Sequence, residues 1–130
     1  NYLIKQANWI TNQRIKNANK LDKALSELSG YITVPTRKKG FKHVYHLYMF
    51  YAKKRDRLLS YLLKNGIDAK VHYPIPLHLQ KAAHYLGYKK GDFPVTEAQC
   101  KSIVTLPVHQ HLTVSHVNYM IDRIKAFYKK

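Results

Sequence analysis

Residues 66–80 read Gly-Ile-Asp-Ala-Lys-Val-His-Tyr-Pro-Ile-Pro-Leu-His-Leu-Gln, and several local constraints on the fold meet in them. Gly66 can adopt the left-handed backbone conformation that ends a helix. The alternating residues that follow predict a short strand over residues 70–73. Pro74 and Pro76 must stop that strand, because proline has no backbone N–H and holds the preceding residue extended. The stretch therefore predicts a helix end, a short strand and a stiff loop.

This loop also gathers hydrogen-bonding side chains on a rigid backbone. His72, Tyr73, His78 and Gln80 supply donors and acceptors, which lose little conformational freedom on binding when the backbone is already stiff. One interpretation is a binding site. The other is a strand end with a proline-braced loop, because most loops only connect elements.

The pattern before residue 66 predicts a long helix, two extended segments and a second helix. Apolar residues three and four apart predict a helix over residues 1–28, which Gly30 ends. Residues 31–35 are expected to be extended. Residues 43–52 alternate with apolar side chains on both faces, so we expect a central strand covered on two sides. A helix over residues 56–65 would then cross back to the strand at residues 70–73, giving a β-α-β unit.

The pattern after the loop predicts three helices and one strand. Pro94 suits a first helical turn, and Thr113 is a good N-cap. Short strands mixed with helices favour the α+β class, with a small sheet covered by helices. The elements expected here are helices over residues 79–86, 95–101 and 114–128, and a strand over residues 102–108.

The composition is that of one ordinary domain. A chain of 130 residues with 45% hydrophobic residues can bury a core. No apolar run is long enough to predict a membrane span or a leader. The single cysteine, Cys100, excludes an internal disulfide framework. This fits the cytoplasmic location that we expect, although a secreted protein without disulfides would look the same. Because the chain begins with Asn1 and not with methionine, we expect a processed product or an excised piece.

A net charge of +16 and a pI near 10.0 point to anionic partners. Nucleic acid, acidic lipid surfaces and phosphorylated small molecules all fit this charge. The basic residues are mostly lysine and occur in every segment, with no run that resembles a basic arm. A solvated, lysine-rich surface is therefore the simpler interpretation.

The residues do not combine into a complete active site. The eight histidines lack the spacing of a metal site, and the seven acidic residues are scattered. Cys100 has no visible partner that would activate its thiol, and the glycines are too separated to form a phosphate loop. The sequence alone therefore predicts no metal site and no catalytic residue.

Several motifs together resemble one known family. They occur in order, in a match that covers roughly residues 45–125, and their joint spacing is far more specific than any one of them. In this respect the chain resembles the C-terminal third of the DegT/DnrJ/EryC1/StrS family of sugar aminotransferases. The motifs are residues 44–48 (Val-Tyr-His-Leu-Tyr), residues 57–67, residues 71–80, Phe93-Pro94 and Leu106-Pro107.

The resemblance implies an enzyme of the aspartate-aminotransferase (type I) fold that depends on pyridoxal 5'-phosphate (PLP). Such an enzyme moves an amino group from an amino acid, usually glutamate, to a nucleotide-linked keto sugar for polysaccharide or amino-sugar biosynthesis. In the family a large N-terminal domain supplies the cofactor lysine. Residues 1–130 would then be the small C-terminal domain, with residues 1–28 as the connecting helix. The piece alone would be inactive and would hold neither catalytic nor cofactor-binding residues.

The resemblance also implies where the substrate binds. The segment that matches His72, Tyr73 and Pro74 lies beside the cofactor in the family and shapes the sugar-nucleotide pocket, so these residues and His78 are the expected substrate-binding residues. Full-length members are homodimers. Two positions depart from the family pattern: Gln110 replaces a frequent proline, and the last helix lacks an acidic first turn.

Two alternatives stay open. A stand-alone basic module that binds nucleic acid would explain the charge, although no specific nucleic acid and no membrane partner is expected for the enzyme. A non-catalytic interaction domain derived from the same family would explain the motifs.

Overall fold

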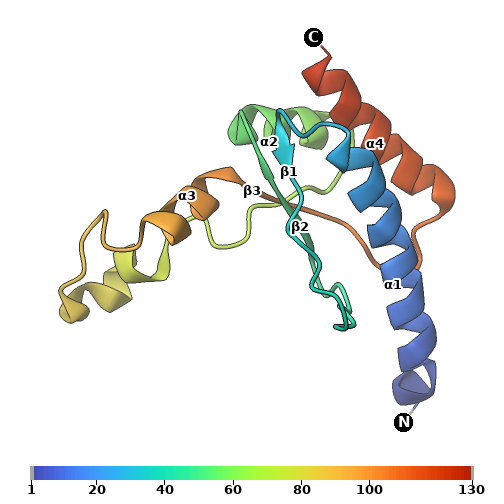
Figure 1. Cartoon of the computed structure of the whole chain (residues 1–130), viewed down its shortest axis with the longest axis horizontal. Helices are drawn as coiled ribbons and strands as arrows, with labels where there is room; N and C mark the ends of the chain where they lie inside the picture. Colours follow the sequence, from blue (N-terminus) through green and yellow to red (C-terminus); the bar gives the residue numbers. More distant parts are fainter. Residues whose placement is uncertain (1, 130) are drawn as a thin grey trace.

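The computed structural model describes residues 2–129 and has an antiparallel sheet at its centre (Figure 1). The strand order is β1-β2-β3, so β2 is the central strand, as predicted. Tyr48 lies opposite Leu106, and Tyr51 lies opposite both Thr33 and Ile103. The α+β class is confirmed. The strands are β1 (Ile32–Thr33), β2 (Tyr48–Ala52) and β3 (Ile103–Leu106).

Three helices and one face of the sheet form a single hydrophobic core. Figure 1 shows α1 (Tyr2–Ser26, blue) beside α4 (Val114–Tyr128, red), with α2 (Arg55–Lys64) at the upper end of the sheet. The described part of the chain contains no helix long and apolar enough to cross a membrane. The largest fully buried core side chains are Leu21, Leu25, Tyr48, Phe50, Leu58, Leu62, Val104, Val117 and Ile124.

Only one face of β2 is fully covered. Tyr48, Phe50 and Ala52 are buried, whereas Met49 and Tyr51 on the other face are half-buried. The prediction that both faces are covered is therefore wrong within the described residues.

Strand β2 begins later than residue 43 because α1 holds the backbone before it. The guanidinium of Arg14 donates from Nη1 to the carbonyl oxygens of Tyr45 and His46, each at 3.2 Å. Tyr45 has a left-handed backbone (φ 49°), and its N–H donates to the His43 ring at 3.0 Å. These bonds replace the sheet hydrogen bonds that the apolar alternation predicts.

The helices over residues 56–65, 95–101 and 114–128 are confirmed within a residue or two as α2, α3 (Pro94–Ser102) and α4. The first helix ends at Ser26, four residues before Gly30 by their numbers, and Asn1 lies outside the described residues. The predicted helix over residues 79–86 is instead a pair of 3₁₀ helices, η1 (Leu77–Leu79) and η2 (Lys81–Leu86).

The predicted strand over residues 70–73 is reduced to one bridge. Lys70 pairs with Thr105 in antiparallel orientation, through N–H···O bonds of 3.0 and 2.8 Å. Because β2 also runs antiparallel to β3, the segment at Lys70 runs parallel to β2 with β3 between them. The crossover from β2 through α2 therefore exists, but its second strand is a single residue pair.

Helix α4 begins with a capping box that uses histidine in place of an acid. The Thr113 hydroxyl accepts from the His116 N–H at 3.2 Å, and the His116 Nδ1 accepts from the Thr113 N–H at 3.3 Å. This reciprocal pair satisfies two backbone donors at the start of the helix. His116 thus occupies the position that glutamate or glutamine takes in the usual capping box, so the helix is capped without an acidic first turn.

Residues 74–102, called the arm below, project from the sheet and return to it (Figure 1). The arm has few buried side chains, and one carboxylate links three of its segments. The Oε1 atom of Glu97 accepts from the Gly91 N–H at 2.7 Å and from the His78 Nε2 at 3.1 Å. The Gly91 N–H, with the His78 ring adding to it, lowers the pKa of Glu97 below its ordinary value of 4.5.

A second carboxylate joins α1 to the centre of the sheet. Asp22 accepts from Nε and Nη2 of Arg37, at 3.0 and 2.9 Å, and from the hydroxyl of Tyr48 at 2.8 Å. The Arg37 guanidinium lies over the rings of Tyr45 and Tyr48. Burial and the Asp22 carboxylate both raise the pKa of Tyr48, so its hydroxyl stays protonated as the donor.

We expect Tyr48→Phe to lower the free energy of unfolding by about 1.5 to 3 kcal/mol, because it removes a hydrogen bond to a charged group. Urea unfolding followed by circular dichroism measures this loss. Tyr51→Phe is the matched control, since the Tyr51 hydroxyl has no hydrogen bond among the described residues. Equal stability of the two variants would show that the Asp22 contact contributes nothing.

We also expect the arm to loosen in acid. Because folding lowers the pKa of Glu97, its contribution is fully present above pH 4.5 and is lost as the pH falls through the lowered value. The amide resonance of Gly91, followed by NMR from neutral to acid pH, reports the break. Glu97→Gln should abolish this pH response, and a response that persists in the variant would assign it to another group, such as Asp92.

Candidate functional site

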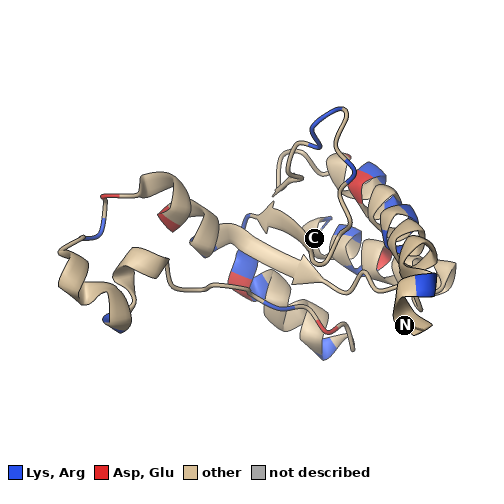
Figure 2. Ribbon diagram, turned by 90° about the horizontal axis from the view of Figure 1, so that it is seen from below, with Lys and Arg blue, Asp and Glu red and all other residues tan. Residues whose placement is uncertain are grey.

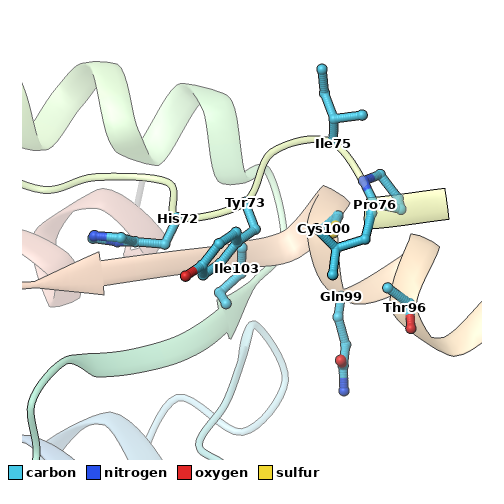
Figure 3. A pocket seen from close by; sticks show the side chains of 9 residues that line it. His72, Tyr73, Ile75, Pro76, Thr96, Gln99, Cys100 and Ile103 are labelled. Carbon is cyan, nitrogen blue, oxygen red and sulfur yellow. The ribbon is translucent and has the colours of Figure 1, made fainter. Parts of the chain in front are cut away.

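The loop after Lys70 and the returning end of the arm border an open cavity of about 270 Å³ (Figure 3). The loop supplies one wall, α3 supplies another, and β3 supplies the floor. Most of the lining is apolar, with a few polar groups at its edges. The lining residues are His72, Tyr73, Ile75, Pro76, Leu77, Thr96, Gln99, Cys100 and Ile103.

His72 is held by the floor of the site. Its Nδ1 atom lies 2.9 Å from the hydroxyl oxygen of Thr105, and the Lys70–Thr105 bridge anchors the backbone just before it. The His72 ring also lines a second, open cavity on its other side, together with Asp68 and His109. Because Nδ1 is engaged, Nε2 is the ring nitrogen left for a ligand.

Tyr73 projects from a strained backbone. Its φ angle is 59°, which is left-handed and not the extended geometry predicted for a residue before proline. A side chain in this conformation costs on the order of 1 to 2 kcal/mol. The side chain is 68% exposed, so the strain is not explained by burial of the ring. Strained residues of this kind concentrate at ligand sites.

The other two predicted substrate-binding residues, Pro74 and His78, do not line the cavity. Pro74 is exposed and does not belong to the lining. His78 is buried inside the arm, where it pairs with Glu97 and packs on Phe93 with ring centroids 4.7 Å apart. This geometry favours a structural role for His78.

Sequence reasoning missed the wall that α3 contributes. Thr96, Gln99, Cys100 and Ile103 lie three and four residues apart, so they share one side of the helix and its exit. That spacing was visible, but nothing local indicated that this side would return to face Tyr73. Thr105 was missed for the same reason, because its contact with His72 spans 33 residues.

The cavity does not fit PLP by itself. That cofactor needs a lysine amine for its aldehyde and cations or N–H groups for its phosphate. The lining contains neither lysine nor arginine. Within residues 2–129, no cluster of three or more His, Cys, Asp or Glu side chains could hold a metal ion. Figure 2 shows lysine and arginine spread over helices and loops instead of gathered at one site.

Comparisons with known proteins agree with this architecture. Residues 3–125 match the model of the DegT/DnrJ/EryC1/StrS aminotransferase family. A pleiotropic regulatory protein of Geobacillus stearothermophilus is 38% identical over 120 residues, which cover 92% of this chain and 32% of that protein. A dTDP-3-amino-3,6-dideoxy-alpha-D-galactopyranose transaminase of Aneurinibacillus thermoaerophilus is 30% identical over 97 residues, which cover 75% of this chain and 26% of that protein.

Solved structures agree as well. The crystal structure of S. venezuelae DesV in complex with a ketimine intermediate superposes with a TM-score of 0.89 at 27% identity, over 98% of this chain and 34% of that one. The chain thus spans about a third of the length of the relatives that it matches. Because the family model covers nearly all of residues 2–129, this chain belongs to the DegT/DnrJ/EryC1/StrS aminotransferase family.

Proposed function

We propose that this chain is the small C-terminal domain of a PLP-dependent aminotransferase that acts on a nucleotide-linked keto sugar. The observation that carries the proposal is a family match over residues 3–125 that accounts for only about a third of each relative. Two relatives at 30% and 31% identity are dTDP-sugar transaminases. The amino donor is an amino acid, for which glutamate is the first candidate.

The remaining two thirds of such an enzyme would hold PLP, since the cavity of this chain offers no lysine. Helix α1 would be the connecting helix. Its first turns and the arm carry exposed apolar side chains that a larger domain or a partner subunit would cover. These side chains are Tyr2, Leu3, Ile4 and Trp9 on α1, and Ile75, Leu77, Tyr85, Leu86 and Val95 on the arm.

His72 and Tyr73 are the substrate-binding residues in this proposal. The Thr105 hydroxyl orients the His72 ring, so Nε2 can hydrogen-bond to a sugar hydroxyl or a phosphate oxygen. Tyr73 offers an exposed phenol on a constrained backbone. Pro74 keeps the loop stiff, and His78 supports the arm through Glu97. Thr105 acts through His72 and is a positioning residue.

In the full-length enzyme, we expect His72→Ala to lower kcat/KM for the keto-sugar half-reaction by roughly ten- to 150-fold. The loss corresponds to one hydrogen bond with a charged or strongly polar group, about 1.5 to 3 kcal/mol. The glutamate half-reaction should be unchanged, because glutamate carries no nucleotide for this loop to hold. Single-turnover kinetics with the keto sugar and with glutamate measure the two half-reactions separately.

His84→Ala is the matched control, because His84 is exposed on the arm and does not line the cavity. Thr105→Val should reproduce part of the His72→Ala effect, whereas Thr105→Ser should retain the wild-type rate. Equal losses in both half-reactions, or a loss of stability at an unchanged rate, would make His72 structural. A full-length protein without any aminotransferase activity would instead support a non-catalytic member of the family.

A further inference from the structure

Another cavity, of about 310 Å³, lies away from the His72 site, where the start of α2 meets the end of α4. It is lined by Lys54, Arg57, Tyr61 and Phe127, none of which lines the cavity at His72. Figure 1 shows this end of the domain, with the last turns of α4 rising beside α2. The arm, which carries the other site, extends from the opposite side of the sheet.

The two cations of this cavity have no anionic partner in the described part of the chain. Neither Lys54 nor Arg57 forms an ion pair there, and the adjacent Asp56 is engaged with Arg55 at 2.6 Å. Two positive charges at one cavity repel each other. A bound anion would relieve that repulsion, and arginine offers the planar fork that suits phosphate oxygens.

The backbone adds positive potential at the same edge. Lys54 is the N-cap residue of α2 and has no side-chain cap, so the first N–H groups of this ten-residue helix lack a partner from that side chain. Its left-handed backbone (φ 56°) is uncommon for a lysine. These features add to the case for an anion site at this cavity, but they would not define a site if the cavity were absent.

The rest of the lining is aromatic. Tyr61 follows Arg57 by one turn of α2, and Phe127 comes from α4. Their ring centroids lie 5.4 Å apart, with the ring planes tilted by 45°. Phe127 packs on Tyr128, which stacks on Tyr31 with centroids 4.9 Å apart. The Tyr128 hydroxyl donates to the Lys53 carbonyl at 2.6 Å. These contacts hold Phe127 in place, so its ring can offer a face to a flat ligand with little loss of side-chain freedom, while Tyr61 borders the same space.

We propose that this cavity binds a small molecule that carries a phosphate on a flat ring system, of the class of a nucleoside monophosphate. Arg57 and Lys54 hold the phosphate, and the ring rests against Tyr61 and Phe127. The volume lies at the small end of ligand pockets, which suits one nucleotide better than a strand of nucleic acid. This site is independent of the proposed aminotransferase function.

The test is an NMR titration of the 130-residue chain with adenosine monophosphate, and separately with inorganic phosphate and with adenosine. We expect amide shifts at residues 54–61 and at Phe127. Arg57→Gln should raise the Kd for the nucleotide about tenfold or more, because it removes a charge-assisted contact. Phe127→Leu should raise the Kd for the nucleotide and leave that for phosphate unchanged.

Lys64→Gln is the control, because it makes the same change of charge at the other end of α2. Thermal melts establish that each variant is folded. Equal weakening of nucleotide binding by Arg57→Gln and Lys64→Gln would show that only net charge attracts the nucleotide, and would overturn the proposal. The proposal would also fail if phosphate bound as tightly as the nucleotide, or if the amide shifts appeared only at residues 72–77.

Discussion

The hydrogen bonds that the Asp22 carboxylate accepts are the interactions on which the position of the sheet depends. The carboxylate accepts hydrogen bonds from Arg37 in the loop before β2 and from Tyr48 in β2, so it links α1 to the central strand. The register of β2 against β3 starts at Tyr48, and β3 in turn presents Thr105 to His72. The position of His72 in the candidate site therefore depends, through β3 and β2, on the hydrogen bonds of Asp22 in α1.

Where sequence patterns identified elements correctly, the deciding interactions were local. Helix α4 followed from its apolar stripe and the Thr113 cap, and α3 followed from Pro94. The errors arose where distant partners decided the backbone. Arg14 delays β2 across more than 30 residues of chain, as the separations of 31 and 32 residues show. Periodicity within one segment cannot reveal such a donor.

For the candidate site, the proline loop singled out His72 and Tyr73, because stiffness and polar side chains are visible in sequence. The structure places both residues in the lining of one cavity, and their role in substrate binding stays a prediction. The loop sequence could not reveal that His78 turns inward, since its partner Glu97 lies 19 residues away on α3. The charge of +16 was equally ambiguous. The His72 cavity has no lysine or arginine in its lining, whereas Lys54 and Arg57, which form no ion pair within residues 2–129, line the cavity between α2 and α4.

The bridge between Lys70 and Thr105 has an evolutionary consequence. It fixes both ends of the arm to the sheet, so the chain between them closes a loop whose entropy depends only weakly on length, by about 0.6 kcal/mol for each doubling. Few arm side chains reach the core. Insertions, deletions and exchanges in the arm can therefore accumulate without unfolding the domain, which leaves this segment free to diversify the shape of the cavity while the sheet is retained.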